Sequence, residues 1–181
     1  MAIIKRSPIG ADQPPVPQDW GRKGIGGHPR TPGRSNPAPP VKNFPKSKRL
    51  IINSDGAAVP NPGPAGIGAV LRNDRGDIVA EISKYIGPAT NNKAEFLALI
   101  AGLEKALELD AEHVDINSDS ELIVRQIEGK YRSKAMKPLF DQVVSLLGEF
   151  KSYTVQHIPR EQNTEADALS KRALSLRSKA R

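Results

Sequence analysis

The chain has 181 residues, of which 38% are hydrophobic, and its formal net charge is +7. This length suits one domain with a tail, and the absence of cysteine excludes disulfide bonds and thiolate metal sites. No apolar run reaches the ~20 residues that a membrane-spanning helix needs, and Ala2-Ile3-Ile4 is too short an apolar stretch for a signal peptide.

Residues 1–48 are predicted to form a disordered basic tail. Residues 1–50 hold ten Lys or Arg against two acids, whereas residues 51–181 hold seventeen against eighteen. Ten of the sixteen prolines also lie in residues 1–48, which show no periodic apolar pattern. Such a segment buries too little surface to offset its ordering entropy. It is either a solvated linker or a sequence-independent tether for polyanions, since Lys and Arg displace counterions from phosphates.

The first half of the predicted domain contains three strands and a long helix. The expected strands are residues 50–53, ending at the turn pair Asp55-Gly56, and then 66–71 and 78–86. Residues 61–64 form a predicted loop and residues 73–76 a hairpin turn. A helix is predicted over residues 92–108, and its buried stripe consists of Phe96, Leu99, Ile100, Leu103 and Leu107.

The second half continues with two more strands and three helices. The predicted strands are 114–117 and 153–158, and the predicted helices are 120–127, 138–150 and 164 to about 176. A short basic end, residues 177–181, follows the domain, which spans 49–176. The order βββαβααβα predicts an α/β fold with a mixed sheet flanked by helices.

Four carboxylates are candidates for chemistry, although each has an ordinary explanation. Asp-Gly is a common turn pair, which accounts for Asp55. Glu95 is placed to complete a capping box with Asn92, and the same motif pairs Ser118 with Glu121 around Asp119. Asp119 and Asp167 are also plausible first-turn acids, which the helix dipole stabilises.

Taken together, the four acids point to a metal site. They fall at the end of one strand and at three helix starts, and ligands gather beside such strand ends in α/β sheets. Converging carboxylates without basic partners repel each other, and a divalent cation relieves the repulsion. Oxygen ligands favour Mg²⁺ or Mn²⁺. Two such ions can clamp the attacking and leaving oxygens of a phosphodiester displacement.

Four motifs occur in order along residues 50 to about 174. They are Asp55-Gly56 with Asn61-Pro62-Gly63-Pro64-Ala65-Gly66, then Thr90-Asn91-Asn92-Lys93-Ala94-Glu95, then Ser118-Asp119-Ser120, and finally His157-Ile158-Pro159-Arg160-Glu161-Gln162-Asn163 leading to Ala166-Asp167. With these motifs the segment resembles the catalytic domain of type 1 ribonuclease H, in its compact bacterial and archaeal form.

The resemblance implies a ribonuclease H-like fold, with a five-stranded mixed sheet whose first three strands are antiparallel. It implies endonucleolytic hydrolysis of the RNA strand of RNA–DNA hybrids, leaving 5′-phosphate and 3′-hydroxyl ends. The cofactor would be two Mg²⁺ ions, with Mn²⁺ as a possible substitute. Asp55 would bridge both ions, Asp119 and Asp167 would complete the site of the ion that activates water, and Glu95 would serve the leaving-group side.

The resemblance also implies supporting residues. His157 matches a loop histidine associated with proton transfer or product release, and Arg160 is a rival that could hold the scissile phosphate as a bidentate partner. The ordinary alternatives are a half-buried residue at a strand end and a solvated loop cation. Further positions match contacts to the hybrid, although turn and cap roles would also explain them: Asn61, Thr90, Asn91 and Asn92.

The sequence departs from the family pattern at three places. Pro88 stands where an arginine is common, and Glu121 where a glutamine is common, which puts two hybrid contacts in doubt. The long basic protrusion is missing, and four residues mark its place: Lys130, Arg132, Lys134 and Lys137. This run is either a solvated loop or a replacement nucleic-acid contact.

Two other functions remain open from the sequence. One is a non-enzymatic module that binds hybrids or double-stranded RNA. The other is a 3′–5′ exonuclease, although the Asp-x-Glu signature of those enzymes is missing because Gly56-Ala57 follows Asp55. The expected location is cytoplasmic, without a membrane association, and the expected state is a monomer.

Overall fold

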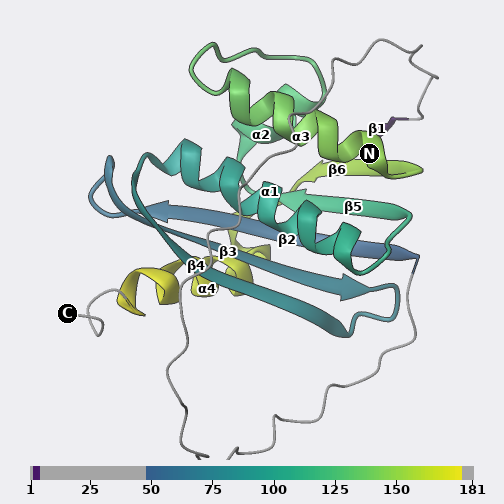
Figure 1. Ribbon diagram of the computed structural model, residues 1–181, viewed down its shortest axis with the longest axis horizontal. Helices are drawn as coiled ribbons and strands as arrows, with labels where there is room; N and C mark the ends of the chain where they lie inside the picture. Colours follow the sequence, from purple (N-terminus) through teal and green to yellow (C-terminus); the bar gives the residue numbers. More distant parts are fainter. Residues whose placement is uncertain (1, 5–47, 177–181) are drawn as a thin grey trace, which may run out of the picture. The chain divides into compact units, whose positions relative to one another are not determined.

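The computed structural model describes residues 2–4 and 48–176, which contain one six-stranded sheet in the order β1-β6-β5-β2-β3-β4 (Figure 1). The strands are β1 (Ala2–Ile4), β2 (Arg49–Ala58), β3 (Gly63–Asn73), β4 (Ile78–Ala89), β5 (His113–Ser118) and β6 (Ser152–His157). β2, β3 and β4 pair antiparallel, whereas β5 runs parallel to β2 and β6 runs parallel to β5. The predicted α/β fold and its five-stranded mixed sheet are therefore confirmed in β2–β6.

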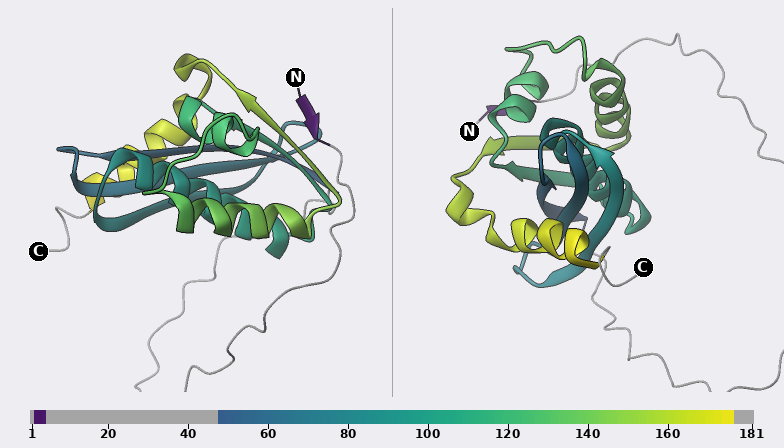
Figure 2. Two further views of the ribbon diagram at one scale, coloured as in Figure 1. Left: turned by 90° about the horizontal axis from the view of Figure 1, so that it is seen from above. Right: turned by 90° about the vertical axis from the view of Figure 1, so that its left-hand side faces the viewer.

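Helices cover both faces of the sheet (Figures 1 and 2). They are α1 (Asn91–Glu108), α2 (Glu121–Ile127), α3 (Lys137–Glu149) and α4 (Thr164–Leu176), with a short 3₁₀ helix η1 (Arg160–Gln162) before α4. α1 packs on β2 and β3 with α3 beside it, and α4 packs on β2, β3 and β4 from the other side. The core lies between α1 and the sheet, where the predicted stripe residues Phe96, Leu99, Ile100 and Leu103 are buried and Leu107 is partly buried.

β2 differs from its prediction because the strand continues through Asp55 and Gly56 to Ala58. Asp-Gly is therefore not a turn here. The glycine serves close packing instead, since a Cβ at Gly56 would lie 2.2 Å from the backbone of Ala94 and of Glu95 in α1. This contact brings the start of α1 against the end of β2, and it places two of the four candidate acids on neighbouring elements.

β1 was not expected, since residues 1–48 were predicted to be disordered. Ala2–Ile4 pairs antiparallel with Tyr153–Val155 of β6 and adds a sixth strand. Two β-branched residues, Ile3 and Ile4, favour the extended backbone of a strand. The rest of the predicted tail, residues 5–47, and the basic end, residues 177–181, lie outside the described residues. No helix in the described ranges is long and apolar enough to cross a membrane.

Candidate active site

Asp55 lies near the end of β2 on the side of the sheet that α4 covers. Successive strand residues alternate between faces, so Gly56 faces α1 while Asp55 faces α4. The side chain is 8% exposed, and the hydroxyl of Ser170 in α4 donates a hydrogen bond to its Oδ2. Among the described residues, no hydrogen bond reaches Asp55 Oδ1.

Glu95 belongs to the second turn of α1, and the predicted capping box is wrong. The N-cap is Thr90, whose hydroxyl oxygen accepts a hydrogen bond from the backbone N–H of Lys93. Glu95 therefore lies too far along the helix to cap it. Its Oε2 instead accepts a hydrogen bond of 2.6 Å from the hydroxyl of Ser120, the residue before α2. A side chain from another element thus fixes this acid.

Asp119 follows β5 and is held by a buried amide. Asn163, just before α4, donates from Nδ2 to Asp119 Oδ1 at 2.8 Å and to the backbone oxygen of Ser54 at 2.9 Å. Asn163 is 1% exposed; its bond to Ser54 is buried and its bond to Asp119 is partly buried. The expected capping box around Asp119 is also wrong, because the Ser118 hydroxyl accepts from the Ser120 N–H and Ser120 is the N-cap of α2.

Asp167 lies in the first turn of α4, as predicted, and differs from the other acids in its partners. Arg160 donates to Oδ1 at 3.0 Å, and Lys171 donates to Oδ2 at 2.6 Å. Both cations are mostly exposed, while Asp167 is largely covered. Each oxygen of Asp167 therefore has an exposed cationic partner. Water can solvate either cation once it releases the carboxylate.

Electrostatic interactions connect the four candidate acids in part: Asp55 interacts with Asp119 and Asp167, and Glu95 with Asp55 and Asp119, while the charge of Arg160 acts on both in the opposite sense. Burial raises the pKa of Asp55, and the nearby charges of Asp119 and Asp167 raise it further. Burial also raises the pKa of Glu95, with contributions from Asp55 and Asp119. Burial acts against ionisation of Asp167 too, but Lys171 and Arg160 outweigh it and lower the pKa of this acid. The site therefore holds excess negative charge around Asp55 and Glu95.

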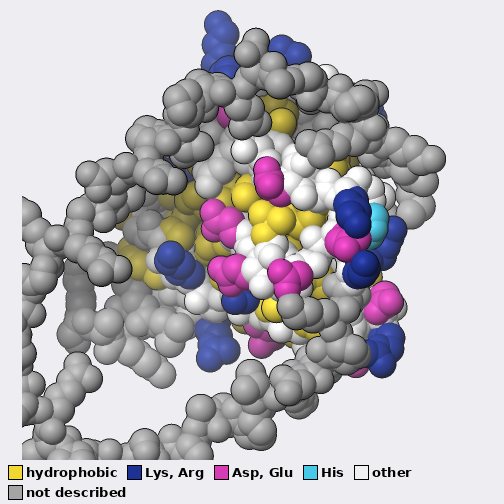
Figure 3. All heavy atoms as spheres, turned by 45° about the vertical axis from the view of Figure 1, so that its right-hand side comes forward, with side chains coloured by type: hydrophobic (Ala, Val, Ile, Leu, Met, Phe, Trp, Pro, Cys, Tyr) yellow, Lys and Arg dark blue, Asp and Glu magenta, His cyan; other side chains and the backbone are white. Residues whose placement is uncertain are grey.

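A contrasting charged cluster lies where β5 and β6 begin. Glu112 forms ion pairs with Lys48 at 3.0 Å and Lys151 at 2.6 Å, and these lysines lower its pKa to about 2. Figure 3 shows such interleaved acidic and basic side chains beside a histidine. Here each negative charge has a cation, so no further ion is needed. Asp55 and Glu95 lack such partners within the described ranges.

The chemistry of the candidate site suits a divalent cation. Its ligand set would be carboxylate oxygens, which hard cations prefer, and the raised pKa values mark a place where positive charge is favourable. Within residues 2–4 and 48–176, no three His, Asp or Glu side chains already form a group that could hold an ion. Both oxygens of Asp167 are hydrogen-bonded to cations instead, Oδ1 to Arg160 and Oδ2 to Lys171.

The two predicted helper residues lie at the rim of the site. His157 ends β6 and is exposed, with Nε2 3.3 Å from the backbone oxygen of Asp119. Arg160, in η1, is exposed and bonds to Asp167. The structure thus brings both residues beside predicted acids, and neither contact decides between their functional and ordinary roles.

Three of the four predicted hybrid-contact residues meet at the start of α1. The Oδ1 of Asn61 accepts from the backbone N–H of Asn91, and the Oδ1 of Asn91 accepts from the backbone N–H of Ala58 at 2.7 Å. Thr90 caps the helix beside them. Asn92 is exposed on the same turn. Asn61, Thr90 and Asn91 therefore have structural roles already, which the predicted alternatives included.

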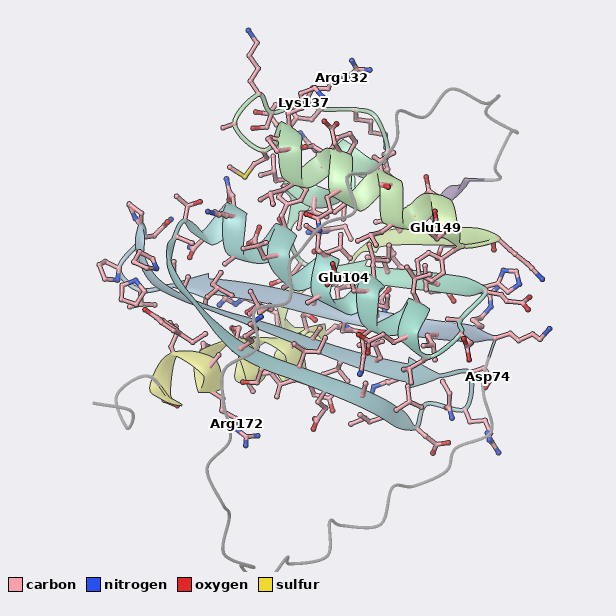
Figure 4. All side chains as sticks on the ribbon, viewed as in Figure 1. Asp74, Glu104, Arg132, Lys137, Glu149 and Arg172 are labelled. Atoms are coloured by element: carbon pink, nitrogen blue, oxygen red, sulfur yellow. The ribbon has the colours of Figure 1, made fainter. Side chains whose placement is uncertain are left out.

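The predicted basic residues lie apart from these amides, on the segment between α2 and α3. Lys130, Arg132 and Lys134 are exposed there, and Figure 4 shows Arg132 and Lys137 at this edge of the structure. Lys130 pairs with Glu128 at 2.8 Å. Glu121, the departure noted in α2, pairs with Arg125 at 2.7 Å. A groove of about 620 Å³ beside α2 is lined by both pairs and by His157.

Sequence reasoning assigned no role to three side chains that position the acids. They are Ser120, Asn163 and Ser170. Ser120 and Asn163 stand within or beside the quoted motifs, but hydrogen bonds between distant segments leave no periodic signal. The sequence offered one indication of their role: these three polar residues stand at positions that the neighbouring hydrophobic pattern predicts to be buried.

Comparisons with known proteins agree with this geometry. The family model described as "Reverse transcriptase-like" matches residues 53–173. The chain is 40% identical over 128 residues to a ribonuclease HI of Halobacterium salinarum, covering 70% of this chain and 64% of that protein. It is 33% identical over 147 residues to a ribonuclease H of Afipia carboxidovorans, covering 72% of this chain and 96% of that one.

Solved structures give the same result. The crystal structure of the Halobacterium salinarum RNase H1 aligns with a TM-score of 0.69 at 39% identity, covering 70% of this chain and 98% of that chain. LC11-RNase H1 in complex with an RNA/DNA hybrid aligns with a TM-score of 0.65 at 40% identity, covering 70% and 96%. The chain spans only 35% of a 39% identical bifunctional protein of Mycobacterium tuberculosis. The family match over residues 53–173 and these relatives show that the chain belongs to the ribonuclease H family.

Proposed function

We propose that this protein hydrolyses the RNA strand of RNA–DNA hybrids as an endonuclease. The proposal rests on the electrostatic interactions of Asp55 with Asp119 and Asp167 and of Glu95 with Asp55 and Asp119, which support a shared site for the four acids. Family membership supports the reaction, and one similar structure, LC11-RNase H1, is a complex with an RNA/DNA hybrid.

Two Mg²⁺ ions, or Mn²⁺ in their place, are the cofactors that we propose, held by the same four carboxylates. When bound, such ions supply a nucleophilic water and stabilise the charge that develops on the scissile phosphate. The protein's own contribution is to fix the ligands beforehand. Neutral donors already hold one oxygen of each of three acids: Asp55, Glu95 and Asp119.

Asp167 has to exchange its partners before it can bind an ion. Arg160 is 70% exposed, so it can leave Asp167 at little cost and donate to a phosphate instead. His157, at the adjacent rim, is placed to move a proton to or from the reacting oxygens. In this proposal, a metal ion that binds Asp167 displaces Arg160. Ion binding thereby frees the arginine to bind a phosphate.

Substrate contacts in the proposal come from two surfaces. The amides and hydroxyl at the start of α1 can bond to minor-groove edges and a DNA phosphate, whereas recognition of the RNA strand requires contacts with 2′-hydroxyls. The basic segment between α2 and α3 supplies phosphate contacts of the non-specific kind. We further propose a monomeric, cytoplasmic protein whose basic tail, residues 1–48, adds non-specific affinity for nucleic acid.

A cleavage assay tests the proposed reaction. The purified chain, with Mg²⁺ and separately with Mn²⁺, is given a covalently closed circular hybrid whose RNA strand is labelled. Cleavage of the circle, with 5′-phosphate and 3′-hydroxyl ends on the fragments, is the expected result, and Asp55→Asn should abolish it without loss of fold. Tight binding without cleavage under both metals would instead identify a binding module. Activity restricted to free RNA ends would identify an exonuclease.

A further inference from the structure

Ser170 lies in α4 with its hydroxyl against the Asp55 carboxylate. Its side chain is 0% exposed, and its Oγ donates a hydrogen bond to Asp55 Oδ2. The same Oγ lies 2.9 Å from the backbone oxygen of Asp167, three residues earlier in the helix. The serine therefore touches one candidate metal ligand through its side chain and another through its backbone.

The contact with Asp55 is not needed to satisfy the buried hydroxyl. A serine hydroxyl carries one proton, and the Asp167 carbonyl alone could accept it. Ser175 in the same helix makes that same backbone contact, with the oxygen of Arg172 at 2.8 Å. An ionised carboxylate is the stronger acceptor, so the Ser170 proton is directed to Asp55.

Close packing fixes where the Ser170 hydroxyl lies. A Cβ at Gly66 of β3 would lie 2.5 Å from the Ser170 carbonyl oxygen, and a Cβ at Gly68 would lie 2.5 Å from the Ser170 backbone nitrogen. Only glycine lets α4 approach β3 so closely. This close approach places the backbone of Ser170 directly against β3, with its hydroxyl in hydrogen-bond contact with Asp55.

We propose that Ser170 is a positioning residue for metal binding, because its hydroxyl holds Asp55 Oδ2 and thereby orients Oδ1 toward the cluster of acids. The second lone pair of Oδ2 stays available to a cation. The inference rests on the proposed function, since it takes Asp55 to be a metal ligand. Removal of a group that orients a ligand typically weakens metal binding by about 10–100-fold.

Metal titration tests this role without relying on turnover. Mg²⁺ and, separately, Mn²⁺ are titrated calorimetrically into the metal-free full chain in the absence of nucleic acid. The dissociation constant of Ser170→Ala should rise by about 10–100-fold, while Ser175→Ala, the matched control in the same helix, should bind as the wild type does. Wild-type affinity in Ser170→Ala would overturn the inference, and so would an equal loss in Ser175→Ala.

A double-mutant cycle separates orientation of Asp55 from simple packing. Urea unfolding with EDTA is measured for the wild type, Ser170→Ala, Asp55→Ala and the double variant. Ser170→Ala should lower the ratio of folded to unfolded protein. The decrease should be about tenfold larger when Asp55 is present than when it is absent, because the lost hydrogen bond is to a charged group. Equal losses in both backgrounds would show a packing role and overturn the inference.

The two proposals fail in different ways. If the wild type cleaves hybrids and Ser170→Ala binds metal normally, the role of Ser170 is refuted while the proposed function stands. If the wild type binds neither metal and leaves hybrids intact, the proposed function is refuted, and the positioning role is refuted with it.

Discussion

Asp55 and Glu95 are carboxylates that folding forces into a place where their charge is unfavourable. Burial and neighbouring acids raise the pKa of both, and no cation pairs with either among the described residues. Ionisable side chains whose pKa values are strongly shifted, at a cost to the stability of the fold, are characteristic of functional sites. At this scale the raised pKa values of Asp55 and Glu95, which the charge of Arg160 offsets only in part, single out these two acids in a way that their positions in the sequence could not.

Removal of the Asp55 charge should therefore stabilise the metal-free protein. A carboxyl whose pKa is raised by folding contributes stability below its ordinary pKa of 3.8, and that contribution is lost as the pH rises through the folded-state pKa. Asp55→Asn should need more urea to unfold than the wild type at neutral pH. Its advantage should shrink as the pH falls toward 3.8. Urea unfolding in EDTA across this range measures the difference.

Glu112→Gln serves as a control for the Asp55→Asn experiment, because its expected effect on stability at neutral pH has the opposite sign. The pKa of Glu112 is lowered to about 2, so its ionised form stabilises the fold above the ordinary pKa of 4.5 and the effect is lost as the pH falls. This variant should be less stable than the wild type at neutral pH. If Asp55→Asn also proved less stable there, the site would not hold the repulsion that the structure indicates.

The elements were largely predictable, and the exceptions have local physical causes. Helical spacing located α1 because its buried stripe faces a continuous sheet. The Asp55-Gly56 pair was taken as a turn because a sequence cannot distinguish a glycine that turns the chain from one that admits a helix. The motifs single out the four acids as candidates, and their role as ligands stays a prediction. Asn163 and Ser170 could not be predicted, because their bonds span more than 40 residues along the chain.

The contact between β2 and α1 should tolerate no side chain at Gly56. The added Cβ would meet backbone atoms of Ala94 and Glu95 at 2.2 Å, and a helix backbone cannot move aside as a side chain can. Gly56→Ala should cost about 1–3 kcal/mol of stability or more, and it should reduce cleavage because Glu95 shifts with α1. Urea unfolding and hybrid cleavage measure the two effects.

Gly102→Ala is the matched control within α1. Its Cβ would meet a single side-chain atom at close range, the Cγ2 of Ile52 at 2.8 Å, whereas the Cβ at Gly56 would meet three backbone atoms. This variant should lose less stability than Gly56→Ala and should keep its cleavage rate. Similar rates for the two variants would mean that the position of α1 does not control Glu95.

Charge is distributed unevenly over the whole molecule. The catalytic segment from residue 51 onward has nearly equal numbers of acids and bases, and its basic segment between α2 and α3 is short. Residues 1–47 hold eight Lys or Arg and two acids. Affinity for a polyanion therefore has two candidate sources in this chain, one between α2 and α3 and one in the N-terminal sequence.

Replacement of the eight Lys and Arg in residues 1–47 by Gln separates these sources while keeping chain length and β1. Each phosphate contact contributes a slope of about −0.9 to a plot of log affinity against log salt for a duplex. If the tail contacts phosphates, the variant should bind hybrids more weakly at low salt and show a shallower slope. Its maximal cleavage rate should not change, because the four acids lie elsewhere.

A matched replacement of Lys130, Arg132 and Lys134 reports the contribution of the α2–α3 segment. Unchanged slopes in the tail variant would assign hybrid affinity to the domain alone.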